Sequence, residues 1–128
     1  MSVSRPVSRS SYDVLGGPVT FTLVWTTEGF GASNPKTYQA LLEAFAEAIE
    51  RINVDKPAAA KMYVEASDSA DDSEFILQML NDPEIVFTLE PQNTMAYATF
   101  MHNVGAINNG PLSWKDYFFA EAQAGAGG

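Results

Sequence analysis

Residues 19–27 read Val19-Thr20-Phe21-Thr22-Leu23-Val24-Trp25-Thr26-Thr27. Apolar side chains at every second position alternate with threonine, which is the pattern of a β-strand with one strongly buried face. Val24 places an apolar side chain on the opposite face, which indicates that this face is partly covered too. Glycines at positions 29 and 31 are expected to end the strand. A second short strand or extended segment is predicted over residues 85–89.

Around these strands the apolar residues recur at helical spacing. The clearest helix runs from Pro35 to Asn53, with Asn34 as its N-cap and the stripe Leu41, Phe45 and Ile49 packing inward. The other predicted helices begin at Asp55, at a capping box formed by Ser69 and Asp72, at Pro91, and at Ser113 with Asp116. The sequence therefore predicts an α/β fold that is mostly helical, with two short strands.

The composition of the chain argues against several classes of function. The 128 residues include 16 acidic and 7 basic side chains, giving a net charge of -9. A duplex-binding protein needs a positive surface for the phosphates, so no nucleic-acid partner is expected. No stretch approaches the roughly 20 apolar residues of a membrane span. The chain has no cysteine, which excludes disulfides, thiolate metal sites and cysteine nucleophiles.

The sequence offers few residues that could carry out catalysis. The single histidine, His102, falls inside a predicted helix, where histidine is far more often structural or solvated than catalytic. The acidic residues Asp68, Asp71, Asp72 and Glu74 lack the glycine and the register of a calcium loop, so helix capping and solvation explain them better. We therefore expect no catalytic residue, no metal and no cofactor, and a protein that is not an enzyme.

Trp25, Thr26 and Thr27 are the candidate substrate-binding residues. Residues at strand ends in open α/β sheets often face a ligand crevice, and hydroxyl groups beside an aromatic ring suit a small polar ligand. Ordinary threonines at a strand end are an equally good interpretation.

Several stretches, taken in order, resemble a known family. They are Ser11 to Phe21, Val24 to Thr27, Asn34 to Tyr38, Pro91 to Met95, Phe100 to Gly105 and Ser113 to Phe119. Together they resemble the C-terminal part of the substrate-binding proteins of ABC importers, in the nitrate/sulfonate/taurine and thiamine-precursor group. The resemblance covers residues 11–119. Residues 1–10 do not match, and residues 120–128 are expected to form a flexible tail rich in small side chains.

The resemblance implies a partial lobe of the type II periplasmic-binding-protein architecture. In that architecture residues 19–27 are similar to a strand that crosses between the two lobes, and the helices from Pro35 onward are similar to the back of the first lobe. It also implies a small anionic or oxygen-rich solute such as nitrate, a sulfonate or taurine, and a membrane permease as partner. Proteins of this family are periplasmic. The sequence as written carries no signal peptide, so it would be cytoplasmic if expressed in this form.

Two other functions stay open. The first is a small helical interaction or dimerisation protein derived from the same fold, and the second is a relative of the thiamine-precursor synthesis enzymes. The enzyme would need several histidines, whereas this chain has one. An apolar strand such as residues 19–27 also needs neighbours that two strands cannot supply, so the isolated chain is a possible homo-oligomer.

Overall fold

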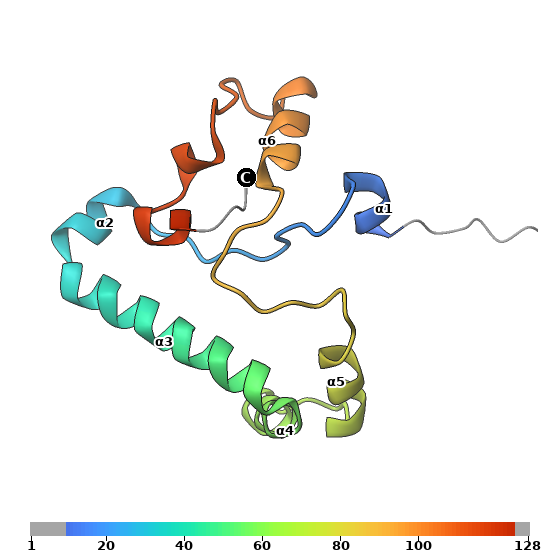
Figure 1. Cartoon of the computed structure of the whole chain (residues 1–128). Coiled ribbons are helices and arrows are strands. Elements are labelled where there is room, and N and C mark those ends of the chain that lie inside the picture. Colours follow the sequence, from blue (N-terminus) through green and yellow to red (C-terminus); the bar gives the residue numbers. More distant parts are fainter. Residues whose placement is uncertain (1–9, 125–128) are drawn as a thin grey trace, which may run out of the picture. The chain divides into compact units, whose positions relative to one another are not determined.

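The computed structural model describes residues 10–124, and these residues form helices joined by irregular segments (Figure 1). The predicted N-terminal segment 1–10 lies outside this range except for Ser10, as do residues 125–128 of the predicted tail. The helices are α1 (Ser11–Leu15), α2 (Glu28–Ser33), α3 (Pro35–Val54), α4 (Lys56–Ser67), α5 (Ser73–Leu80), α6 (Thr94–Asn103) and the 3-10 helices η1 (Trp114–Tyr117) and η2 (Ala120–Ala124).

The predicted α/β class is wrong, because residues 10–124 contain no strand. Residues 19–26 belong to no regular element, and the glycines at 29 and 31 lie inside α2 instead of ending a strand. Residues 85–89 are irregular as well, and the Phe87 carbonyl accepts a hydrogen bond from the Asn53 side chain (3.1 Å). An alternating pattern becomes a strand only where a second backbone segment pairs with it. The partial type II periplasmic-binding lobe, as an α/β structure, is therefore not observed.

Backbone contacts divide the chain into two units. Unit 1 comprises Met1–Leu23 and Glu90–Gly128, of which the structure describes 10–23 and 90–124. Unit 2 comprises Val24–Leu89.

Unit 2 contains the helix that the sequence predicts best. α3 begins at Pro35, as predicted, because proline fits the first helical position, where its missing N–H leaves no bond unmade. The predicted N-cap bond from Asn34 is not formed. The Asn34 side-chain amide instead donates to the Phe30 carbonyl (3.1 Å), so this side chain closes the end of α2.

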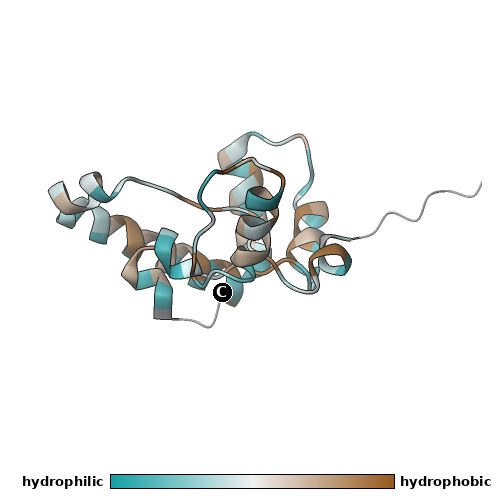
Figure 2. Cartoon of the chain, turned by 90° about the horizontal axis from the view of Figure 1, so that it is seen from above, coloured by the Kyte–Doolittle hydropathy of each residue, from teal (hydrophilic) through white to brown (hydrophobic). Residues whose placement is uncertain are grey.

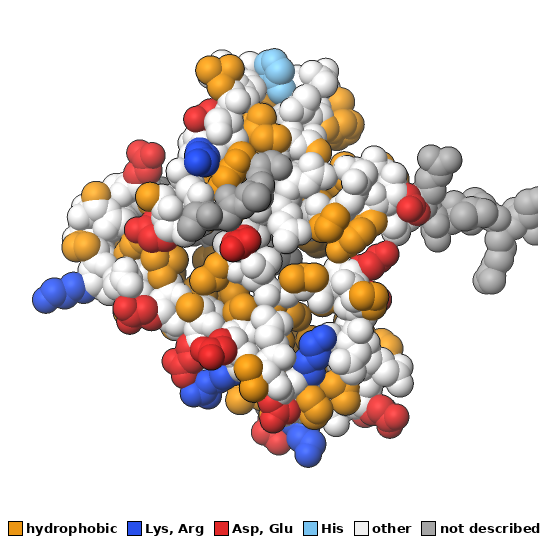
Figure 3. All heavy atoms as spheres, in the orientation of Figure 1, with side chains coloured by type: hydrophobic (Ala, Val, Ile, Leu, Met, Phe, Trp, Pro, Cys, Tyr) orange, Lys and Arg blue, Asp and Glu red, His pale blue; other side chains and the backbone are white. Residues whose placement is uncertain are grey.

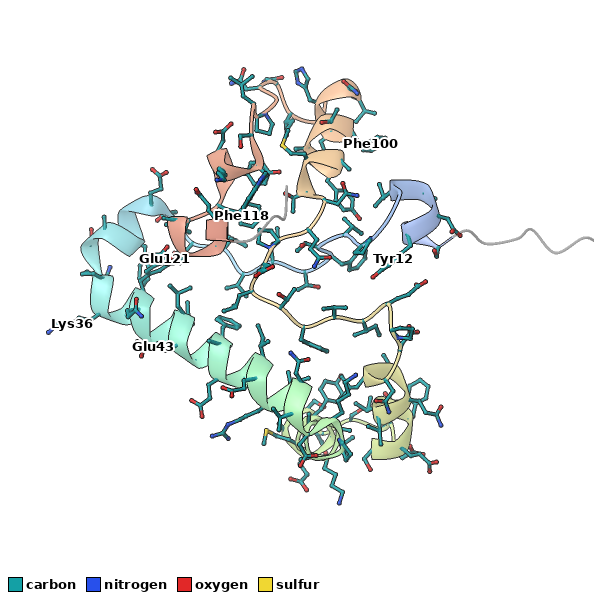
Figure 4. The ribbon with its side chains drawn as sticks, in the orientation of Figure 1. Tyr12, Lys36, Glu43, Phe100, Phe118 and Glu121 are labelled. Atoms are coloured by element: carbon teal, nitrogen blue, oxygen red, sulfur yellow. The ribbon has the colours of Figure 1, made fainter. Side chains whose placement is uncertain are left out.

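The apolar stripe of α3 is less buried than predicted. No residue of α3 is fully buried; Leu41 is exposed, while Phe45 and Ile49 are half-buried. Lys36 and Glu43 project from the same helix into solvent (Figure 4). Ribbons coloured by hydropathy show hydrophobic and hydrophilic residues in close succession along the helices (Figure 2). α3 therefore has an apolar face that is only partly covered.

The tightest packing in unit 2 is between α4 and α5. Ala60 of α4 is 1% exposed and Ile76 of α5 is 8% exposed, and these two are the buried hydrophobic residues of the described chain. A small side chain such as that of Ala60 permits close approach of a helix to its neighbour, since it adds only a methyl group to the backbone. Ala60 and Ile76 are therefore the centre of the core of unit 2.

Side-chain caps fix where these two helices begin. The Asp55 carboxylate accepts from the Ala58 N–H (2.9 Å) at the start of α4. At α5 the cap is Asp72, which accepts from the Phe75 N–H (2.7 Å), and the predicted capping box with Ser69 as N-cap is wrong. Ser69 donates to the Asp71 carboxylate instead (3.2 Å).

Removing the cap of α5 should weaken unit 2. Asp72→Ala is expected to lower the free energy of unfolding by about 1 kcal/mol, because the Phe75 amide loses its acceptor and the helix N-terminus loses a favourable negative charge. Urea unfolding followed by circular dichroism measures this change. Glu65→Ala, an exposed change of the same charge on α4, is the control and should stay within about 0.5 kcal/mol of the parent. Equal effects of the two changes would contradict the capping role.

Candidate functional site

Unit 1 is held together by polar contacts between segments that are far apart in the sequence. The Thr20 N–H donates to the Gln92 carbonyl (2.9 Å), and the Gln92 N–H donates to the Thr20 hydroxyl (2.7 Å). The Asn93 side-chain amide donates to the Leu15 carbonyl (3.0 Å). Asn93 has a φ of 49°, a left-handed conformation that asparagine tolerates better than most residues. We call Leu15, Thr20, Gln92 and Asn93, together with Thr94 and Tyr117, the polar junction.

The C-terminal part of unit 1 joins the polar junction through Tyr117. The Tyr117 hydroxyl donates to the Thr94 hydroxyl oxygen (3.0 Å) and lies 3.7 Å from the Met95 sulfur. Thr94 is 6% exposed, so its oxygen has little access to water. The predicted capping box of Ser113 and Asp116 is confirmed, although the helix that it opens is the single 3-10 turn η1.

The three candidate substrate-binding residues are consecutive and lie immediately before α2. Trp25 is 84% exposed, and Thr26 is half-buried. The Thr27 hydroxyl accepts from the Phe30 N–H (3.1 Å) and so serves as the N-cap of α2. An indole ring and one neighbouring hydroxyl group are thus available for contact with a ligand.

His102 lies in the last turn of α6, next to the turn that follows this helix. Its Nδ1 lies 3.3 Å from the Ile107 carbonyl oxygen. Gly110 lies against its ring, because a Cβ at this position would be 3.1 Å from the His102 Cγ. These contacts suit a structural role in closing the turn.

The acidic residues of 68–74 act mainly at helix ends. Asp68 is the C-cap of α4, with a φ of 49°, and Asp72 is the N-cap of α5. In residues 10–124 there is no group of three or more histidine and carboxylate side chains placed to hold a metal ion. Within the same range no helix has the length and apolar character needed to cross a membrane.

The sequence patterns did not predict the polar junction or the helix α1. α1 begins with a capping box in which Ser10 and Asp13 bond reciprocally to each other's backbone N–H groups (3.3 Å each), a signal that was available in the sequence. No local pattern predicts the polar junction, since its partners are up to 78 positions apart.

Comparison of the chain with protein-family models, with curated proteins and with solved structures finds no match. The family resemblance of residues 11–119 is therefore a proposal.

Proposed function

We propose that the chain is part of the substrate-binding component of an ABC importer for a small anionic or oxygen-rich solute, such as nitrate, a sulfonate or taurine. The observation that carries the proposal is the polar junction. It links three of the stretches that resemble the family, 11–21, 91–95 and 113–119, by hydrogen bonds between them. Stretches of one functional unit are expected to contact each other in this way. The proposed role is to bind the solute in the periplasm and pass it to a membrane permease.

Trp25 and Thr26 are the proposed solute contacts. The exposed indole ring offers an apolar surface, and the Thr26 hydroxyl is a donor for an oxygen of the solute. The net charge of -9 repels an anion at long range, so local donors have to outweigh that field. Because salt screens the long-range repulsion, affinity for an anionic solute is expected to rise with moderate ionic strength.

Calorimetric titration of the protein with taurine and with nitrate tests the proposal. Trp25→Ala is expected to weaken binding at least about tenfold, which corresponds to about 1.4 kcal/mol. His102→Gln is the control and should bind within about threefold of the parent, because the ring serves a turn outside the proposed contacts. The solute should be recovered unchanged, since no enzymatic step is proposed. Failure of both probes to bind, or an equal loss in the two variants, would overturn this assignment.

A second function, that of a small helical interaction or dimerisation protein, is favoured by one observation. Among the described residues only Ala60 and Ile76 are buried hydrophobic residues, while many large apolar side chains are exposed. Hydrophobic side chains are visible at the surface over several parts of the chain (Figure 3). Phe100, for example, projects from α6 and is 60% exposed (Figure 4). Large exposed apolar areas commonly mark interaction surfaces.

A further inference from the structure

Residues 19–27, which we call the apolar segment, combine exposed side chains with unpaired backbone. Phe21 is 83% exposed, Leu23 53% and Trp25 84%. Thr20 donates its N–H to Gln92, but among the described residues no partner is found for the N–H and C=O groups of residues 21–25. The apolar segment therefore has free hydrogen-bonding groups as well as free apolar surface.

The composition of the apolar segment favours pairing as a β-strand. All nine residues are β-branched, aromatic or leucine, the types that suit a pleated sheet. None is charged and none is proline, the residue types by which natural edge strands avoid pairing with other chains. A segment of this kind is a template for another strand.

We infer that the apolar segment pairs with the same segment of a second copy of this chain, antiparallel and centred on Leu23. Such a pair has twofold symmetry, so each contact occurs twice. In this register Leu23 faces its own copy, Phe21 faces Trp25 of the second copy, and Thr20 faces Thr26 of the second copy. Aromatic pairs and threonine pairs directly opposite each other stabilise antiparallel strands. In this register the side chains of one copy of the apolar segment are therefore complementary to those of the second copy.

The area of the contact and the absence of charged residues from the apolar segment also favour a second copy as the partner. The pairing places no two like charges opposite each other, although each chain carries a net charge of -9. Salt should therefore strengthen the dimer by screening repulsion between the remaining parts of the two chains. The four aromatic side chains of the pair carry on the order of 800 Å² of surface, which is the scale of a weak, reversible interface. The dimer is expected to form and dissociate with concentration.

Single cysteines test the register, because the chain has no cysteine of its own. Leu23→Cys is expected to form a disulfide-linked dimer at least about tenfold faster than Val24→Cys, since opposed Cβ atoms lie about 5 Å apart and diagonal ones about 7–8 Å. Val24 is similarly exposed and provides the matched control. A mixture of Thr22→Cys and Val24→Cys should cross-link between the two variants, because this register brings positions 22 and 24 opposite each other. Equal rates for Leu23→Cys and Val24→Cys would overturn the register.

Charge variants test the dimer without covalent trapping. Leu23→Glu and Leu23→Lys should each be monomeric by light scattering, since each puts like charges directly opposite one another at the twofold axis. Their mixture should associate and show more β-structure by infrared spectroscopy than either variant alone. A variant that had merely failed to fold would not recover association on mixing. A parent chain that stays monomeric at all concentrations, or a mixture that does not associate, would disprove the pairing. These results do not depend on solute binding, so the proposed function stands or falls separately.

Discussion

Replacing Ile76 with aspartate is expected to lower the free energy of unfolding of unit 2 by about 3–5 kcal/mol. The Ile76 side chain is 8% exposed and belongs to α5, which packs against α4, so the change buries a carboxylate. The new carboxylate would also lie one helical turn from Asp72, which adds repulsion between like charges. An uncompensated buried charge typically costs 3–5 kcal/mol, roughly half of the stability of an ordinary domain. Urea unfolding followed by circular dichroism measures the loss.

Gln78→Asp is the matched control for Ile76→Asp. It adds the same charge to the same helix at an exposed position, so it should cost less than about 1 kcal/mol. Ile76→Val, which removes one methyl group, should fall between them at about 1 kcal/mol. Losses of stability that rise from Gln78→Asp through Ile76→Val to Ile76→Asp would show that burial at position 76 causes the effect. If Ile76→Asp cost no more than Gln78→Asp, the α4–α5 contact would not be a core.

Tyr117→Phe should destabilise unit 1 by about 1–2 kcal/mol, the cost of leaving a buried polar atom without its partner. The Tyr117 hydroxyl donates to Thr94, and the 6% exposure of Thr94 leaves little room for water to replace it. Thr94→Val should cost less, because Tyr117 is itself exposed and its hydroxyl can turn to solvent. Thermal unfolding of each variant gives the two values.

A double-mutant cycle separates this hydrogen bond from general packing. In the Thr94→Val background, Tyr117→Phe should cost less than about 0.5 kcal/mol, because both partners are then apolar and of similar shape. Additive losses would show that the Tyr117 hydroxyl acts independently of Thr94. The polar junction would then not extend to η1.

The helices α3, α4 and α5 of unit 2 were predictable because their signals are local. Pro35 at the first turn of α3, the carboxylate of Asp55 before α4 and the apolar spacing of α5 all act within a few residues of where they stand. For these three helices the errors concern which side chain makes the cap. At α5 both Ser69 and Asp72 have suitable chemistry, and the one adjacent to the helix is used.

The strands were not predictable from alternation, because pairing is a property of two segments. Residues 19–27 have the side chains of a strand but, apart from the contact of Thr20 with Gln92, no ladder. At the end of that segment a local helix signal acts instead of strand pairing. Thr27 caps α2, and this helix contains Gly29 and Gly31. The two shortest α-helices of the described residues, α1 and α2, were missed although each begins with a capping side chain.

The candidate site was predictable only in part, for a similar reason. The aromatic ring and hydroxyl at 25 and 26 can be recognised in the sequence as groups suited to a polar ligand. The contacts of Thr20 and Asn93 with segments more than seventy positions away cannot be recognised in the sequence, because neither residue has a distinctive local pattern. The amide and hydroxyl groups that organise unit 1 were therefore found only in the folded chain.

The small number of buried apolar side chains has a thermodynamic consequence. Globular domains gain about 12–15 cal/mol/K per residue in heat capacity on unfolding, mostly because apolar groups become hydrated. In the described part of this chain, side chains such as Phe21, Trp25 and Phe100 are already in contact with solvent when it is folded. Its heat-capacity change per residue should therefore fall well below that range. A small change gives a broad, shallow dependence of stability on temperature, so cooling should weaken the fold less than in a well-packed domain of this length.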